Sequence, residues 1–157
     1  MEESNEQLDQ PPPANVTVQG DADVEYKWLK ENTTAALHYL NLERSEVAVK
    51  VVDDKEMSEL HVKHSSVEGT TDVLTFDHGG DEQCVRADIV VCIDVARREA
   101  ELRGHSLQNE LLLYILHGIL HCCGFDDHDE EAHQQMHTQE DQILKAIGVG
   151  CVWSNKS

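Results

Sequence analysis

The spacing of apolar residues predicts four short strands. Apolar and polar residues alternate over residues 46–52, which is the period of a strand with one buried face. A β-branched run at residues 16–18, ended by Gly20, is typical of an edge strand. Two further apolar runs cover residues 73–76 and 87–93. The second is apolar almost throughout, so we expect it inside a sheet.

Helical spacing of apolar residues occurs between and after these strands. An aspartate or serine stands at the start of each helical segment, where its side chain can accept hydrogen bonds from the first-turn amides. Strands mixed with helices in this order predict an α+β (α/β-like) sandwich. The five predicted helices begin at Asp23, Asp54, Asp94, Ser106 and Asp129, and Gly104 and Gly148 are expected to end two of them.

Length and composition favour a single folded domain over residues 15–150. The chain has 157 residues, of which 39% are hydrophobic, enough for one core. Residues 1–14 are acidic and Pro-rich, so we expect a disordered tail, and residues 151–157 form a short C-terminal tail. No apolar run is long enough to span a bilayer and no signal peptide is evident, so we expect a cytoplasmic protein without membrane contact.

Charge and missing motifs narrow the function classes. The formal net charge of −19 disfavours nucleic acid at long range, and it favours a protein or cationic partner. Neither GxxxxGK[ST] nor GxGxxG occurs, so no nucleotide cofactor is expected. The five cysteines show no CxxC spacing, which argues for reduced thiols.

The strongest chemical signal is the segment HGILHCCGFDDH at residues 117–128. His117 and His121 are four apart on an apolar helix and should share one face. Gly124 can turn the chain back, which would bring Asp127 or His128 towards the two imidazoles. Two histidines, a third ligand and a position left for water make a catalytic zinc site. Two core histidines at this spacing by chance are the alternative, but their ring nitrogens would need other partners.

Two neighbouring sets of residues are interpreted as structural. His133 and His137 are also four apart, but they lie on a polar helix, where solvated histidines are common. Cys122 and Cys123 border the metal segment, and adjacent helical residues point about 100° apart, so at most one could reach the metal. We expect both thiols to be buried and inert.

The 117–128 segment resembles the YbeY family of metal-dependent endoribonucleases, whose hallmark is HGxLHxxGyDH. Residues 71–76, TDVLTF, resemble the TDVLSF stretch of that family, and residues 87–90, ADIV, resemble its GDIVI. The likeness continues from residue 130 to 148. It implies a central mixed sheet of about four strands flanked by helices, with a zinc site on the C-terminal helix and turn.

Two departures from the family pattern affect the site. The family's third histidine comes ten residues after the first, where this chain has Asp127, and His128 follows one residue later. We predict His117, His121 and His128 as the ligands of one Zn²⁺ per chain, with Asp127 as the alternative third ligand. The family's arginine, in a YRG-type stretch, corresponds to Ser65.

The resemblance implies a zinc-dependent, single-strand-specific endoribonuclease of rRNA maturation and ribosome quality control. His117 and His121 would be its catalytic residues, rRNA its substrate, and ribosomal proteins further partners. A zinc metalloprotease-like hydrolase is one alternative, although Gly118 stands where HExxH proteases have their glutamate. A non-catalytic, ribosome-associated protein-binding module with structural zinc is the other.

Overall fold

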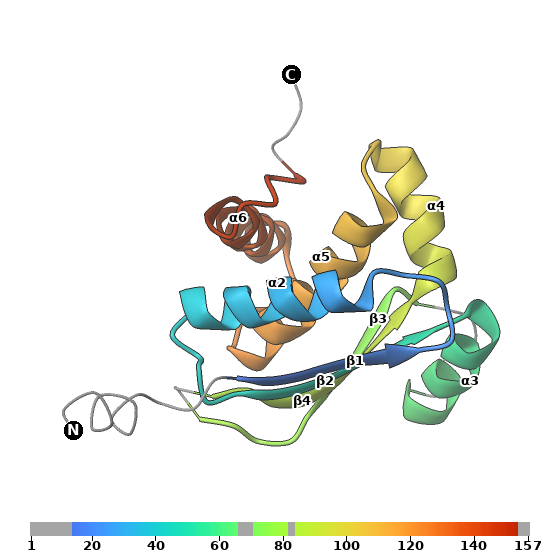
Figure 1. The fold of residues 1–157 in the computed structure, drawn as a ribbon, viewed down its shortest axis with the longest axis horizontal. Helices are drawn as coiled ribbons and strands as arrows, with labels where there is room; N and C mark the ends of the chain where they lie inside the picture. The colour runs from blue at the N-terminus through green and yellow to red at the C-terminus, as the bar shows by residue number, and fades with distance from the viewer. Residues whose placement is uncertain (1–13, 66–70, 82–83, 154–157) are drawn as a thin grey trace.

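Four strands form one mixed sheet in the computed structural model, which describes residues 14–65, 71–81 and 84–153 (Figure 1). Their order is β1-β2-β4-β3, with β1, β2 and β4 parallel and β3 antiparallel to β4. The predicted mixed sheet is confirmed, with the first strand at an edge and the most apolar strand inside. The strands are β1 (Asn15–Gly20), β2 (Glu46–Val52), β3 (Val73–Asp77) and β4 (Arg86–Cys92).

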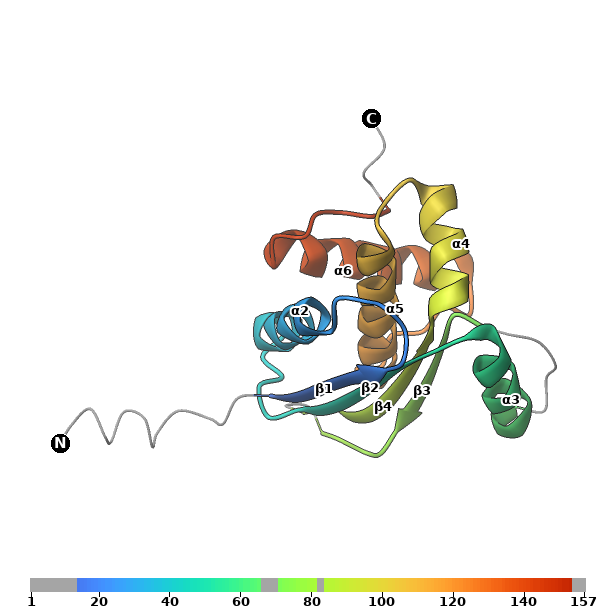
Figure 2. The same cartoon turned by 45° about the vertical axis from the view of Figure 1, so that its right-hand side comes forward.

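Helices cover the two faces of the sheet unequally. One face carries α2, α4, α5 and α6, and α3 packs on the other, near the end of the sheet (Figure 2). Met57 of α3 is fully buried there, in a small cluster with Leu74 and Val90. This arrangement confirms the predicted α+β class. The helices are α2 (Tyr26–Tyr39), α3 (Asp54–Ser65), α4 (Ile93–Arg103), α5 (Leu107–Cys122) and α6 (Glu130–Ala146).

Helix α5 is the centre of the main core. It lies between the sheet and α6 and also contacts α2 and α4 (Figure 2). Its apolar side chains reach all its neighbours, which explains why the segment has almost no polar face. Burial of the apolar surface of α5 fixes the helix in place, and with it the two histidines that it carries. The core residues of α5 that are at most 1% exposed are Leu111, Leu112, Ile115, Leu116, Ile119 and Leu120.

Two of the predicted helix caps are confirmed. The Ser106 hydroxyl accepts a hydrogen bond from the Asn109 amide at 3.1 Å, and Asp129 accepts one from the Ala132 amide at 2.7 Å. Gly104 ends α4 in the left-handed conformation, with φ 74°. These positions depend only on residues three or four apart, so the local sequence was sufficient.

Three predicted caps are wrong. The first helix begins at Tyr26 after Glu25, not at Asp23, and no side chain caps it. The cap of α3 is Asp53, which accepts from the Glu56 amide at 2.8 Å, rather than Asp54. Asp94 lies inside the first turn of α4, and its carboxylate accepts from the Asp54 amide at 2.8 Å. Asp94 therefore serves a neighbouring helix, which no local pattern predicts.

The ends of the chain are only partly described. The predicted tail over residues 1–14 lies outside the described residues except for Ala14, as do residues 154–157 of the C-terminal segment. No described helix is long and apolar enough to cross a membrane. All five cysteines are free thiols; of the two beside the metal segment, Cys122 is half-buried and Cys123 is exposed, so neither is the fully buried thiol expected.

Candidate metal centre

His117 and His121 meet at the carboxyl end of α5. Their Nε2 atoms lie 3.0 Å apart, and the ring planes are inclined at 81°. The shared face predicted from their spacing is therefore confirmed. Gly118, between them, allows α5 to approach the sheet closely, because a Cβ there would lie 2.7 Å from Thr75 Oγ1. The packing of α5 on β3 thus brings the two imidazoles beside that edge strand.

The turn after α5 supplies a carboxylate as the third group. Gly124 has φ 97°, a conformation that favours glycine, and the chain turns back there as expected. Asp127 Oδ2 then lies 3.8 Å from His117 Nε2. The donor atoms of His117, His121 and Asp127 all lie within 4.8 Å of one another. In the described chain His128 is not part of this group, so the geometry favours the alternative third ligand.

Glu140 of α6 orients His117. Its Oε2 lies 2.9 Å from His117 Nδ1, and its side chain is only 1% exposed. A carboxylate can only accept here, so Nδ1 carries the proton and the Nε2 lone pair faces the site. Burial by itself lowers the pKa of His117, but the hydrogen bond and charge of Glu140 outweigh it and raise the pKa above 6.5.

The three donors fit zinc. Two imidazole nitrogens on one tetrahedral zinc lie about 3.3 Å apart, because each Zn–N distance is about 2.0–2.1 Å. The 3.0 Å separation of the two Nε2 atoms is close to this distance. A carboxylate oxygen is an acceptable third donor, and three protein ligands leave the fourth position for water or substrate. A carboxylate behind a ligand histidine is also the usual outer support of such sites.

A hollow of about 360 Å³ opens beside the two histidines. Asp72 and Asp77, near the two ends of β3, border it together with Thr75 and Cys122. Among the described residues that line it there is no lysine or arginine. Burial, followed by the charge of Asp77, raises the pKa of Cys122 to about 11, so its thiol stays protonated at neutral pH.

Sequence reasoning missed Glu140, Asp72 and Asp77. Asp72 lies in the TDVLTF stretch, but its position beside the histidines depends on how α5 packs on β3. Glu140 is 23 residues from His117, and the only signal for it was an acidic residue among apolar positions of a late helix. The interpretation of the second histidine pair is only partly right. His133 is exposed, whereas His137 stacks on Trp153 with ring centroids 3.7 Å apart.

The family sequence model described as "Endoribonuclease YbeY" matches residues 15–148, most of the chain. The chain belongs to the YbeY family.

Three bacterial relatives illustrate the YbeY match. The Endoribonuclease YbeY of Frankia casuarinae is 38% identical over 112 residues, which are 64% of this chain and 56% of that protein. That of Bifidobacterium animalis subsp. lactis is 34% identical over 71% of this chain and 67% of its own length. That of Staphylococcus saprophyticus is 36% identical over 68% and 75%. The chain thus spans little more than half of the Frankia protein.

The YbeY chain also has a solved structural neighbour. The solution structure of TM1509 from Thermotoga maritima superposes with a TM-score of 0.61, covering 90% of this chain and 99% of that one. The identity of 22% supports the fold alone. The arrangement of strands and helices is therefore shared with an experimentally determined protein.

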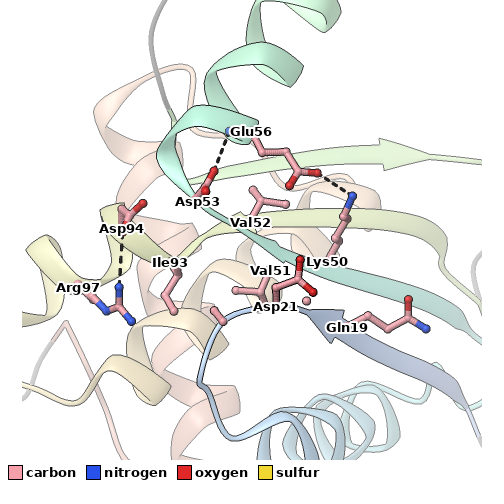
Figure 3. A pocket seen from close by; sticks show the side chains of 12 residues that line it. Gln19, Asp21, Lys50, Val51, Val52, Asp53, Glu56, Ile93, Asp94 and Arg97 are labelled. Atoms are coloured by element: carbon pink, nitrogen blue, oxygen red, sulfur yellow. Dashed lines mark hydrogen bonds and ion pairs between the residues drawn. The ribbon is translucent and has the colours of Figure 1, made fainter.

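A larger hollow of about 590 Å³ lies elsewhere on this YbeY chain, at the carboxyl ends of the parallel strands (Figure 3). Its charged groups neutralise one another in part. Lys50 lies 2.7 Å from Glu56, and Arg97 lies 3.5 Å from Asp94. Because its aspartates and glutamate outnumber its two cations, this hollow suits an anionic ligand poorly.

Proposed function

We propose that this protein is a zinc-dependent endoribonuclease that cleaves single-stranded RNA during rRNA maturation and ribosome quality control. One Zn²⁺ per chain would be held by His117, His121 and Asp127. The convergence of both Nε2 atoms, with Glu140 behind His117, in a chain of the YbeY family is the observation that carries the proposal. Three relatives bear the name Endoribonuclease. Ribosomal RNA, ribosomal proteins as partners and a cytoplasmic location rest on the family resemblance.

The residues at this site have different roles. Zinc bound here would polarise a phosphoryl oxygen and lower the pKa of a bound water. Glu140 keeps the proton of His117 on Nδ1 and so presents Nε2. The carboxylates of Asp72 and Asp77 border the same hollow and are available to accept a proton there. A metal ion held by His117, His121 and Asp127 would supply positive charge for the transition state.

The protease alternative is disfavoured by Gly118. HExxH proteases need a glutamate directly after the first histidine. At this position even a Cβ atom would lie 2.7 Å from Thr75 Oγ1 and 3.1 Å from Ile89 Cδ1. A glutamate side chain would therefore require α5 to move away from the sheet. The site has no room for the general base of that mechanism.

The structural-zinc alternative is disfavoured by the open side of the site. A structural zinc site is closed by four protein ligands. Here the described residues bring three donors together beside a hollow of about 360 Å³. Such an arrangement suits exchange of water for substrate better than a sealed site. The acidic surface remains compatible with a protein partner in addition to RNA.

The deciding experiment is a cleavage assay with purified protein. Structured RNA, unstructured RNA and casein would each be incubated with protein as purified, with chelator, and with chelator followed by zinc. His121→Ala removes one proposed ligand. His133→Ala is the matched control, because it removes an exposed histidine from a neighbouring helix.

We expect cleavage of unstructured RNA that is lost with chelator, restored by zinc, lost in His121→Ala and retained in His133→Ala. Casein should remain intact. RNA that stays intact under every condition, or that is cleaved equally by His121→Ala, would overturn the nuclease proposal. Casein cleavage that depends on His121 would support the protease instead.

A further inference from the structure

The C-terminal segment beyond the family match is held against α6. Asp141, which is 7% exposed, accepts hydrogen bonds from the Val152 and Trp153 amides at 2.7 and 3.0 Å. The chain turns into this position at Gly148 and Gly150, with φ of 88° and 102°. Two backbone hydrogen bonds to one buried carboxylate define where Trp153 lies.

The Trp153 indole packs between side chains from two other parts of the fold. The His137 ring stacks on it at an interplanar angle of 11°. The Arg103 guanidinium lies 4.6 Å from the ring centroid, and Arg103 is itself paired with the buried Glu110. Stacking and cation–π contact together orient the ring. Its one polar atom, Nε1, then points at Glu140.

Trp153 and His117 bind opposite oxygens of the same buried carboxylate. Trp153 Nε1 donates to Glu140 Oε1 at 2.8 Å, and His117 Nδ1 lies 2.9 Å from Oε2. Glu140 comes from α6, whereas His117 comes from α5. Loss of the hydrogen-bond donor to a buried carboxylate oxygen is energetically unfavourable, and it leaves the carboxylate free to rotate. The indole therefore limits the rotation of the carboxylate that orients His117.

We propose that Trp153 is a positioning residue for the metal centre, acting on His117 through Glu140. The inference rests on the metal site of the proposed function and does not require that the substrate be RNA. Trp153 lies outside residues 15–148, which match the family model. This support therefore comes from a part of the chain that the family match does not include.

The test is the zinc affinity of Trp153→Phe, measured by competition with a chromogenic chelator. Phenylalanine keeps an aromatic ring for His137 and Arg103 but removes the N–H donor. Trp28→Phe is the matched control, because Trp28 is the other tryptophan of the chain and lies on α2. We expect Trp153→Phe to weaken zinc binding by about tenfold, within the range usual for outer-sphere partners, and Trp28→Phe to leave it within about twofold.

Three further measurements separate positioning from general loss of structure. In a Glu140→Gln background, Trp153→Phe should cause little additional loss of zinc affinity, because both substitutions disrupt the same chain of hydrogen bonds to His117. In Trp28→Phe protein the single remaining tryptophan is Trp153, so its fluorescence should change on zinc addition. Trp153→Phe protein should show no such change. Thermal unfolding without zinc checks that each variant folds.

The outcomes distinguish this inference from the nuclease proposal. The positioning role of Trp153 would be overturned if Trp153→Phe and wild type bound zinc equally well. It would also be overturned if the effects of Trp153→Phe and Glu140→Gln on zinc affinity were fully additive. A wild-type protein that binds no zinc would overturn both proposals. If zinc affinity responds as expected but no RNA is cleaved, the positioning role stands and only the nuclease activity fails.

Discussion

Glu140 Oε2 lies 2.9 Å from His117 Nδ1, although the two residues are 23 positions apart and belong to different helices. The contact joins the histidine segment of α5 to the inner face of α6. It makes the last helix part of the candidate metal centre as well as a cover for the core.

Glu140→Gln should weaken zinc binding by about 10- to 100-fold. An amide has nearly the same shape, but it carries no charge to stabilise the proton on His117 Nδ1. Zinc competition measures the effect. Glu130→Gln, at the exposed start of the same helix, is the control and should bind zinc as wild type does. Equal affinities of the two variants would show that Glu140 does not support the ligand.

Asp127→Asn should weaken zinc binding more than His128→Asn. Asp127 Oδ2 lies 3.8 Å from His117 Nε2, whereas His128 lies outside the described donor group. Both variants receive the same side chain, which makes them matched, and metal content after dialysis against a weak chelator compares them. If His128→Asn lost more zinc than Asp127→Asn, the third ligand would be the His128 imidazole, as the family pattern favours.

Gly118→Ala should lower the free energy of unfolding, although alanine is the better helix former by about 1 kcal/mol. The new Cβ would lie 2.7 Å from Thr75 Oγ1, and such overpacking costs about 1–3 kcal/mol. Denaturant unfolding measures the net loss. In a Thr75→Ala background the loss should shrink, because the nearest atom is removed. A stabilised Gly118→Ala protein would contradict the close packing of α5 on β3.

Tyr114 should make the protein sensitive to high pH. Burial, and then neighbouring Glu110, raises the pKa of Tyr114 above its ordinary value of 10.0. The folded state therefore holds its proton where the unfolded chain loses it, so this contribution to stability is complete below about pH 10 and falls as pH rises further. Tyr114→Phe should lose less stability than wild type between pH 9 and pH 11, as followed by urea unfolding. If the free energies of unfolding of the two proteins fell in parallel over this pH range, the role of Tyr114 would be contradicted.

Much of the site followed from the sequence because its signals are local. The four-residue spacing of His117 and His121 determines their shared helix face, and Gly124 permits the turn after them. Ser106 and Asp129 capped their helices as expected. Each of these relations spans only a few residues, so the rules of helix geometry were sufficient.

Other expectations failed where tertiary contacts compete with local ones. Asp94 has the position of a cap, but its carboxylate accepts from the Asp54 amide of another helix. The third ligand remains a prediction: the sequence favoured His128 for its ligand type, with Asp127 as the alternative. The turn places Asp127 Oδ2 3.8 Å from His117 Nε2, which favours Asp127. One residue of register in a turn changes which side chain points inward, and local sequence does not determine that register.

The sequence by itself determined the family, the strands and helices of the fold, and the histidine pair, because periodicity and a compact motif encode them. Only the tertiary structure decided that Glu140 lies behind His117, that Asp72 and Asp77 border the hollow, and that Trp153 reaches Glu140. These contacts join residues far apart in the chain. They form because α5 is buried between the sheet and α6, and that packing depends on all the elements together.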